Sequence, residues 1–387
     1  MADSSGQLSL GVILKAEEES SYPDQPSDVQ LQGTGATGLH LLSENLKFTQ
    51  ERNEIGTLDA GAGMKEADVV AAAVGGDVKV LGSYNDISVP LCMALGFEHC
   101  DDSPAADASQ YRHVLEIDNR LAREGWTTED QRTPGAGWEA GDRKVREFAV
   151  AVSKQVSDWV YDGLMIESMN LSVSVSEVSW SFTTAGRIRR RVSYTPGSWG
   201  ALSTVKTRLL FQDLTVSLGS TDGVTYGYAA IGISELELTL ENNLETGHRD
   251  TNSGKYIIEP ERSGPYTVTG RIRVPRYSSD DVFDVFAAGT DMKMKIAFGS
   301  GNYEVNLYLP KVHFTSAGAE TTGPELRQCE YDFRAVVPDA LTEDTNGFKS
   351  GAPDSWYSEL GGIALRKNGS LVIIVVDDKS ADVLTEV

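Results

Sequence analysis

Apolar and polar residues alternate along segment after segment of this chain, which is the period of a β-strand and not of a helix. In the clearest segment, residues 169–183, Leu171, Val173 and Val175 alternate with serines. Because every second side chain of a strand points to the same side, such a segment buries one face and leaves the other to water. The sequence therefore predicts a mainly β fold built from antiparallel sheets. The other alternating segments are 209–218, 236–240, 266–274, 292–298 and 303–309.

Turn-forming residues bound these segments. Gly, Asn, Asp and Ser gather at 220–223 and 299–302, where they favour hairpins between neighbouring strands. Helical spacing is scarce, and we expect only two short helices, over 90–95 and 279–288. The second begins with Ser and Asp, which suit a helix N-terminus. Helices this short flank a sandwich or barrel and do not form its core.

Two halves of the chain resemble each other. With 387 residues the chain is long enough for two domains that each bury a core. Two β-rich halves could share alternation by chance, but a shared order of several patterns indicates a duplicated domain. The three pairs of similar segments, in the same order, are 46–53 with 236–243, 80–83 with 268–271, and 177–182 with 327–333.

These features predict four regions. Residues 1–45 mix a short apolar patch with acidic and proline-containing stretches, as an N-terminal arm would. The first β domain is expected over 46–232, with a charged loop insertion at about 120–147, and the second over 233–345. Residues 346–387 are expected to form a C-terminal β segment.

Composition excludes several classes of protein. The chain has 34 Lys and Arg against 57 Asp and Glu, and its net charge of −23 opposes binding to DNA and to anionic membranes. The longest apolar run, 371–376, is far shorter than the roughly 20 residues that a membrane helix needs. The first ten residues show no secretory signal, so we expect the protein to stay in the cytoplasm in which it is made. The three cysteines suggest neither a disulfide framework nor a zinc site.

Residue patterns for catalysis are weak. The sequence has no nucleophile elbow, no HExxH and no P-loop. The glycines of 33–38 match a dinucleotide-binding string but lack the buried strand and the helix that it requires. His99 stands beside Cys100, Asp101 and Asp102, and a solvated turn explains such neighbours better than a metal site does. We therefore expect that the protein is not an enzyme and that it binds no cofactor and no metal.

Five segments, 14–22, 46–54, 80–83, 161–164 and 166–185, carry a resemblance to a known family. Together they resemble the tail tube proteins of long-tailed phages of the siphophage type. This resemblance implies two tandem tail-tube-like β-sandwich or barrel domains with short flanking helices, long loops and an extended N-terminal arm. It also implies that the inner sheets join across subunits into one β-barrel lining a channel, and that rings of such domains stack.

A tail tube subunit would assemble with itself. If both halves are tube domains, three chains supply six of them and form a pseudo-hexameric ring; a hexamer of chains with one tube domain each is the alternative. The resemblance further implies contacts with the tape measure, tail tip and terminator proteins, and passage of double-stranded DNA without binding. No membrane is involved, and the protein would belong to the virion tail.

The alternating strands supply candidate channel-lining residues. In both repeats one face packs in the core, which leaves the polar face for a water-filled lumen, where acidic groups would repel phosphate. An ordinary solvated face is the alternative for any single strand. The candidates are Lys47, Thr49 and Glu51 in the first repeat and Glu237, Thr239 and Glu241 in the second.

Candidate contacts between rings come from one basic run and from the insertion. In an acidic chain, the basic run 187–191 is best explained as a complement to an acidic patch of a neighbouring ring. The residues proposed for these contacts are Arg187, Arg189, Arg190, Arg191, Trp126 and Trp138.

A different class of function stays open at this point. A β-sandwich adhesin or a capsid-decorating protein would bind glycan or protein through exposed aromatic side chains. Trp126, Trp138 and Trp199 would then line the binding patch.

Overall fold

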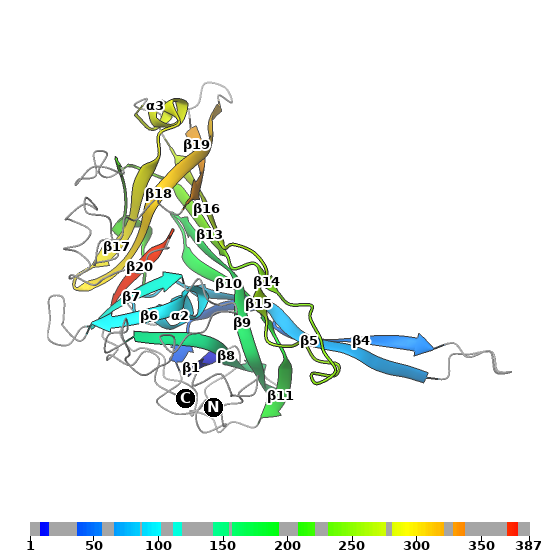
Figure 1. Cartoon of the computed structure of the whole chain (residues 1–387). Coiled ribbons are helices and arrows are strands. Elements are labelled where there is room, and N and C mark those ends of the chain that lie inside the picture. The colour runs from blue at the N-terminus through cyan, green and yellow to red at the C-terminus, as the bar shows by residue number, and fades with distance from the viewer. Residues whose placement is uncertain are drawn as a thin grey trace.

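A computed structural model shows a mainly β protein, as predicted (Figure 1). Almost all of the strands belong to one antiparallel sheet, and only β14 (Leu244–Glu245) and β15 (Glu261–Arg262) pair separately. The described residues are 8–14, 37–55, 66–85, 87–101, 111–117, 142–154, 157–192, 208–220, 231–275, 281–320, 328–336 and 370–377.

The strands fall into a first half and a second half of the chain. Those of the first half are β1 (Leu8–Leu14), β2 (Thr37–Leu39), β3 (Leu41–Glu44), β4 (Lys47–Ile55), β5 (Glu66–Leu81), β6 (Gly96–Asp101), β7 (Tyr111–Ile117), β8 (Asp142–Lys154), β9 (Ser157–Ser174), β10 (Val178–Gly186) and β11 (Ile188–Val192). Those of the second half are β12 (Leu214–Ser220), β13 (Glu235–Glu241), β16 (Thr267–Val274), β17 (Met292–Ser300), β18 (Tyr303–Glu320), β19 (Gln328–Ala335) and β20 (Val372–Asp377).

The order of strand pairing is the same in both halves. In the first half, β4 pairs with β5, β5 with β10, β10 with β9, and β9 with β8. In the second half, β13 pairs with β16, β16 with β19, β19 with β18, and β18 with β17. Each half also has a short helix that follows the second strand of its series along the chain. α2 (Ser88–Leu95) follows β5, and α3 (Asp281–Ala288) follows β16.

One continuous sheet connects the halves. β9 pairs with β10 on one side, and on the other side its residues 168–174 pair with β13, the first strand in the pairing series of the second half. The resulting sheet runs β3/β4, β5, β10, β9, β13, β16, β19, β18, with every neighbouring pair antiparallel.

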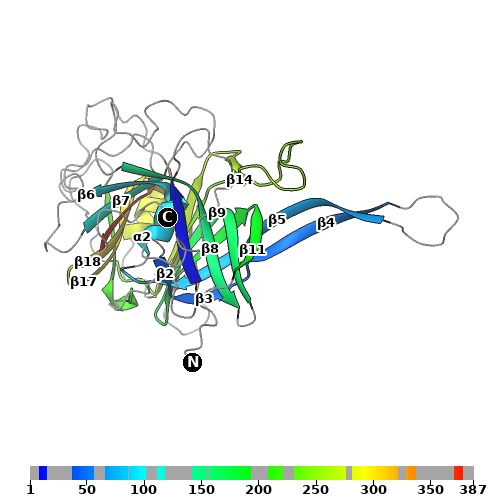
Figure 2. The ribbon, with the colours of Figure 1, turned by 90° about the horizontal axis from the view of Figure 1, so that it is seen from below.

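A closed ring of strands surrounds α2. Starting at β9, the pairings pass through β13, β16, β19, β18, β20, β7, β6 and β8 and return to β9. All eight residues of α2 are buried, and the helix lies among these strands in Figures 1 and 2. A helix that is apolar on all sides has to be buried in this way. It ends at Gly96, whose φ of 92° is the left-handed conformation of a helix C-cap.

Both predicted helices exist with slightly different bounds. The expected helix 90–95 begins two residues earlier, at Ser88, and the expected helix 279–288 begins at Asp281. Neither is long and apolar enough to cross a membrane, and the described part of the chain has no other candidate helix.

Some expectations from the sequence are wrong. Residues 169–183 are not one strand but a hairpin of β9 and β10, and Val175, expected to be buried, lies in its turn with 73% of its surface exposed. The nitrogen of Ser174 donates to the carbonyl of Glu177 at 2.9 Å and closes this turn. In the expected strand 209–218, residues Phe211–Asp213 form a 3-10 helix before β12 begins.

The described part of 1–45 is not a free arm. β1 pairs along its whole length with β8, and β2 pairs with β1, so an apolar patch near the N-terminus is part of the sheet. The expected C-terminal segment contains β20, which lies between β18 and β7. Of the insertion 120–147, residues 120–141 lie outside the described residues, and 142–147 begin β8.

A buried polar cluster holds the end of β20 in place. The Asp377 carboxylate accepts a hydrogen bond from the Ser88 hydroxyl at 2.9 Å and lies 3.2 Å from Nε2 of His113. All three side chains are buried, so each contact replaces bonds to water that folding removes. These two contacts join the end of β20 to α2 and to β7.

Candidate functional site

The long sheet has one polar face that crosses both halves. Residues directly opposite each other on antiparallel strands lie on the same face, so their pairings can be followed from strand to strand. One such series, the polar row, crosses all eight positions of the sheet without an apolar residue. Its members are Ser43, Lys79, Ser181, Asn170, Thr239, Thr269, Arg334 and His313.

The opposite face of the sheet forms the core. The neighbouring row is apolar throughout, and its large side chains are at most 4% exposed. Burial of this row on one side fixes the polar row on the other, because successive side chains of a strand alternate. The members of the apolar row are Val80, Trp180, Leu171, Leu238, Gly270, Phe333 and Phe314.

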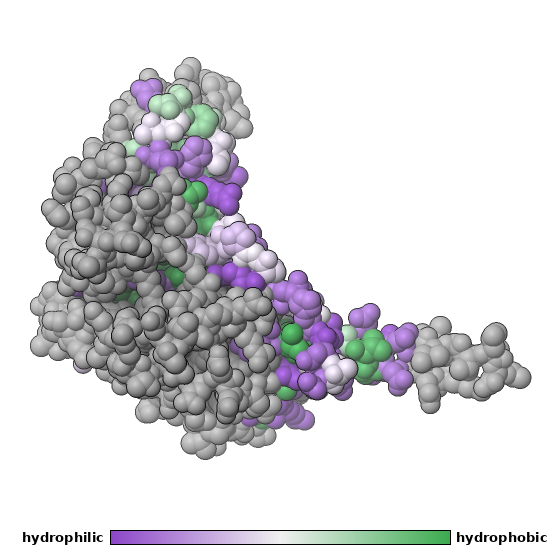
Figure 3. All heavy atoms as spheres, viewed as in Figure 1, coloured by the Kyte–Doolittle hydropathy of each residue, from purple (hydrophilic) through white to green (hydrophobic). Residues whose placement is uncertain are grey.

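Figure 3 shows where this face lies on the molecule. The outline of the chain is concave between the lobe that carries α3 and the β4–β5 hairpin, which projects to the right. The described residues along this concave side are mostly hydrophilic.

On β9 and β10, the polar face carries hydroxyl and amide groups and no charge. Within the chain, the amide of Asn170 donates to the hydroxyl of Thr239 at 2.8 Å and so links the two halves across the β9–β13 junction. Hydroxyl and amide groups attract a phosphate backbone far less than cations do. The residues of this stripe on β9 and β10 are Ser168, Asn170, Ser172, Ser174, Ser179, Ser181 and Thr183.

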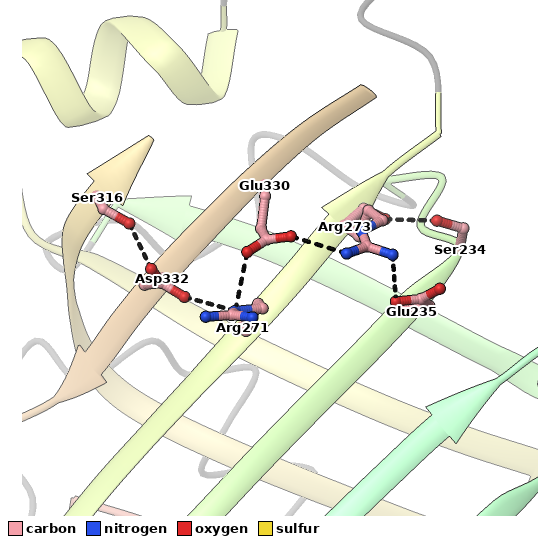
Figure 4. Close-up of polar contacts among 7 residues, drawn as sticks. All are labelled: Ser234, Glu235, Arg271, Arg273, Ser316, Glu330 and Asp332. Atoms are coloured by element: carbon pink, nitrogen blue, oxygen red, sulfur yellow. Dashed lines mark hydrogen bonds and ion pairs between the residues drawn. The ribbon is translucent and has the colours of Figure 1, made fainter. Parts of the chain in front are cut away.

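On the second half, cations and carboxylates of the polar face pair with one another across strands (Figure 4). Arg271 of β16 donates from Nε to Asp332 of β19 at 2.8 Å and lies 3.1 Å from Glu330. Arg273 bridges Glu330 at 3.0 Å and Glu235 of β13 at 2.7 Å. Each arginine therefore meets two carboxylates on its own sheet.

Hydrogen bonds hold this network in its charged form. The hydroxyl of Ser316 donates to Asp332 at 2.5 Å, and this bond, followed by the bond from Arg271, lowers the pKa of Asp332. The bonds to carboxylates raise the pKa of Arg271 and of Arg273. Hydrogen bonds to the ionised form of a group favour that form.

A similar pairing occurs on the first half. Lys79 of β5 lies 2.7 Å from Glu177 in the β9–β10 turn, and its bond lowers the pKa of that carboxyl. The carboxylate of Asp77 accepts from Thr183 at 2.7 Å and from Asn45 at 2.9 Å. Lys79, Arg271 and Arg273 are thus each paired with a neighbouring carboxylate, which weakens their attraction for other anions.

The structure places the six predicted lumen residues on this same face. Glu237, Thr239 and Glu241 alternate along β13 with three buried leucines. The first-half candidates occupy every second position of β4: Lys47, Thr49 and Glu51. Asn45, two residues before them, hydrogen bonds to Asp77, which is opposite Thr183 of the polar face. All except the half-buried Thr239 are exposed. That these residues line a channel stays a prediction.

The arginines expected to contact a neighbouring ring have different surroundings. The guanidinium of Arg190 lies 2.8 Å from the buried carboxylate of Asp162, so this residue is held within the chain. Arg189 stacks over the ring of Trp159 at 4.3 Å, and Arg187 lies 5.9 Å from the ring of Tyr256.

Arg189 and Arg191 are exposed on β11, and these two suit the predicted contact best. Trp126, Trp138 and Trp199 lie outside the described residues.

The search of the sequence missed the network of Arg271, Arg273, Glu330 and Asp332. Alternation within β16 marks the arginines, which follow Thr269 at steps of two. Their partners on β19 are about sixty positions away, as Arg271 and Asp332 are 61 residues apart, and no local pattern joins them. Among the described residues, no group of three or more His, Cys, Asp or Glu side chains could hold a metal ion.

Comparison with known proteins points to one family. The sequence matches the family profile described as phage tail tube protein over residues 7–335, which include both halves of the sheet. A search of the curated proteins finds no match. The match extends over most of the 387 residues, so the chain belongs to the phage tail tube protein family and is a structural component of the virion tail, made in the host cytoplasm.

Proposed function

We propose that this protein forms the wall of the tail tube of a long-tailed phage, with the polar face of its long sheet lining the channel through which DNA passes to the host. The observation that supports this best is the sheet itself, which has eight strand positions, a polar face and an apolar face. At its two ends, β3 and β4 and residues 314–320 of β18 have a neighbouring strand on one side alone in the described part of the chain. An open sheet of this kind closes when copies join edge to edge.

The chemistry of the polar face suits a channel for DNA. On β9 and β10 it carries neutral hydroxyl and amide groups, and the arginines of β16 are paired with carboxylates. On β13 it carries the exposed Glu237 and Glu241, which repel phosphate. DNA that moves rapidly needs a wall that does not hold its phosphates, and the net charge of −23 acts in the same direction. The candidate lumen residues of β4 and β13 belong to this wall.

We further propose that each chain carries two tandem tube domains, so that three chains form a pseudo-hexameric ring. The repeated pairing order of the two halves supports the duplication. A heterologous contact that closes by rotation forms a ring, and rings that stack form a tube. The tape measure, tail tip and terminator proteins are the partners expected at the inside and at the ends of such a tube.

Electron cryomicroscopy of the concentrated protein tests this function. We expect hollow tubes whose rings each contain three copies of the 41.8 kDa chain. Rings of six chains would overturn the pseudo-hexamer while leaving the tube. A chain that stays monomeric at high concentration, with tail initiator proteins present, would overturn the tube as well.

A further inference from the structure

We infer that the last part of β18 pairs antiparallel with β3–β4 of a second copy of this chain, with Gly318 opposite Lys47, and that the β9–β13 pairing inside each chain is the template for this contact. The inference rests on the proposed ring and specifies the edges and the register by which copies join.

Two strand edges are available for such a contact. β3 and β4 pair with β5 on one side, and residues 314–320 of β18 pair with β19 on one side. Among the described residues neither has a strand on its other side. A free strand edge presents N–H and C=O groups that a second chain can pair with.

Bulges show which residues of β9 and β18 correspond. Against its hairpin partner, β9 has an irregularity that ends at Leu164, and β18 has one that ends at Val312. In the pairing of β9 with β10, Glu167 has no opposite residue, and in the pairing of β18 with β19, Thr315 has none. The two irregularities are three residues apart in both strands, so Leu164 corresponds to Val312 and Glu167 to Thr315.

The residue of β13 that corresponds to Lys47 follows from the same rows. Met165, one position after Leu164, is opposite Ala185. Ala185 is opposite Gly75, and Gly75 is opposite Lys47. His313, one position after Val312, is opposite Arg334. Arg334 is opposite Thr269, and Thr269 is opposite Thr239. Lys47 of the first half therefore stands where the second half has Thr239.

The contact inside the chain then gives the contact between chains. Thr239 faces Asn170 of β9, which lies three residues after the bulge at Glu167. The residue three positions after the bulge at Thr315 is Gly318. Lys47 of a second copy should therefore face Gly318, and the next pairs are Phe48 with Ala317 and Thr49 with Ser316.

The side chains at these positions fit the contact. Phe48 and Ala317 pack against the core but are only partly buried in the single chain. The residues that correspond to them at the internal junction, Leu240 and Met169, are 0% exposed. Thr49 and Ser316 are both exposed and form a hydroxyl pair of the kind common between neighbouring strands.

An amide side chain marks the same place on both edges. Just after β13, Asn242 is 1% exposed and donates through its side chain to the carbonyls of Ile166 and Ala94, both at 2.9 Å. The residue at this position of the first half is Gln50, which is exposed in the single chain. Phe314 corresponds to Ile166. Pairing in the inferred register therefore brings the side-chain amide of Gln50 to the carbonyl of Phe314 of the next copy, as Asn242 meets that of Ile166.

Disulfide trapping tests the register. The background is Cys100→Ser, since Cys92 and Cys329 are buried. In assembled tubes, Lys47→Cys with Gly318→Cys should form disulfides between chains, seen as dimers and trimers on a non-reducing gel, because opposed residues have Cα atoms about 4.5–5.5 Å apart and a disulfide needs about 4.4–6.8 Å. Thr239→Cys with Asn170→Cys, the corresponding pair, should form the bond within one chain.

The matched control shifts the register by one step on the same face. Lys47→Cys with Ser316→Cys places the thiols on diagonal neighbours, with Cα atoms about 7–8 Å apart, and should give at most a tenth of the crosslinked product. Equal or stronger crosslinking by this pair, or none between chains by the first pair in intact tubes, would overturn the inference while leaving the proposed function. Absence of tubes from the unmodified protein would instead count against the function.

Hydrogen exchange of the unmodified protein covers the case in which the cysteine variants do not assemble. On tube formation, backbone amides within 45–49 and 316–320 should become as protected as those of 168–174, which we expect to exchange slowly in the free chain because they pair with β13. Unchanged exchange of both segments in tubes would contradict the contact.

Discussion

At the scale of single residues, the polar face is a set of charges that satisfy one another. Arg271 and Arg273 meet carboxylates from β13 and β19, and Ser316 completes the shell of Asp332. Such pairs add little stability when they are exposed to solvent. Their larger effect is on the surface itself, which shows few unmatched cations.

The lowered pKa of Asp332 gives a prediction for pH dependence. The folded chain keeps this carboxylate charged at pH values where the unfolded chain begins to bind a proton, so its stabilisation is complete above about pH 4 and disappears as the pH falls through the folded pKa. Asp332→Asn should lower the free energy of unfolding at pH 7 by at most about 1 kcal/mol, after allowance for solvent screening, and the difference should shrink towards pH 3.

Urea unfolding at pH 7, 5, 4 and 3 measures this difference. Asp284→Asn on the exposed side of α3 is the control and should behave like the unmodified protein at every pH. A difference for Asp332→Asn that stays constant down to pH 3 would show that the loss is not electrostatic.

Gly270 carries a prediction about packing. A Cβ at this position would meet the ring of Phe333 and would lie 2.7 Å from the carbonyl oxygen of Glu237, so only glycine fits between β13 and β19. Gly270→Ala should destabilise the chain by about 1–3 kcal/mol. The control is Gly299→Ala, where no atom lies within 4 Å and the effect should be within about 0.5 kcal/mol. Thermal unfolding of both variants decides, and equal midpoints would be the contrary result.

At the scale of elements, the two helices occupy corresponding places with different surroundings. α2 is enclosed on all sides, whereas α3 exposes Asp284, Ala287 and Ala288. The difference arises because β6, β7 and β20 cover the first helix, and the second half has no strands between α3 and β17.

Truncation inside α2 should therefore be costly. Leu95 is 0% exposed, and Leu95→Ala should lower the free energy of unfolding by about 2–5 kcal/mol. Leu210, 43% exposed, offers the same substitution at the surface and should lose less than about 1 kcal/mol. Similar losses for the two variants in denaturant titrations would mean that α2 is not tightly packed in the folded chain.

The sequence predicted strands and faces well and register poorly. Alternation identified the strands that correspond in the two halves, but it aligned Leu46 with Leu236, whereas the structure aligns it with Leu238. It also aligned Val80 with Val268, whereas the structure aligns it with Val274. Both errors are even numbers of residues, which leaves each side chain on its correct face.

Register was not predictable because bulges decide it. Glu167 and Thr315, the residues that the pairing passes over, have no distinctive sequence pattern. The hairpin turn at Val175 was hidden for a related reason, since an apolar residue continued the alternation through it. The candidate site was predicted where it followed from alternation alone, as on β13, and was missed where it depended on pairing between distant strands.

At the scale of the whole molecule, the chain is strongly acidic, and its polar face combines a neutral stripe on β9 and β10 with exposed glutamates on β13. If this face lines the channel, reversing charges on it should impede DNA and leave assembly intact. Glu237→Lys with Glu241→Lys places two unpaired cations on β13, where phosphate would bind.

Phage carrying this double variant should assemble tails of normal length but release DNA at least tenfold more slowly, measured by dye uptake after receptor addition. Asp284→Lys with Glu304→Lys makes the same change of charge at exposed positions away from the polar row and should release DNA normally. Equal slowing by both variants would attribute the effect to total charge and not to the lining.

The closed ring of strands around α2 has a mechanical consequence. It joins the two halves of one chain twice, through β9–β13 and through β20–β7. In the proposed ring of three chains, the three junctions within chains would therefore each have two strand pairings. The three junctions between chains would each have one strand pairing, between β18 of one chain and β4 of the next. A tube under strain should therefore split lengthwise along three lines and not six, and shed whole chains.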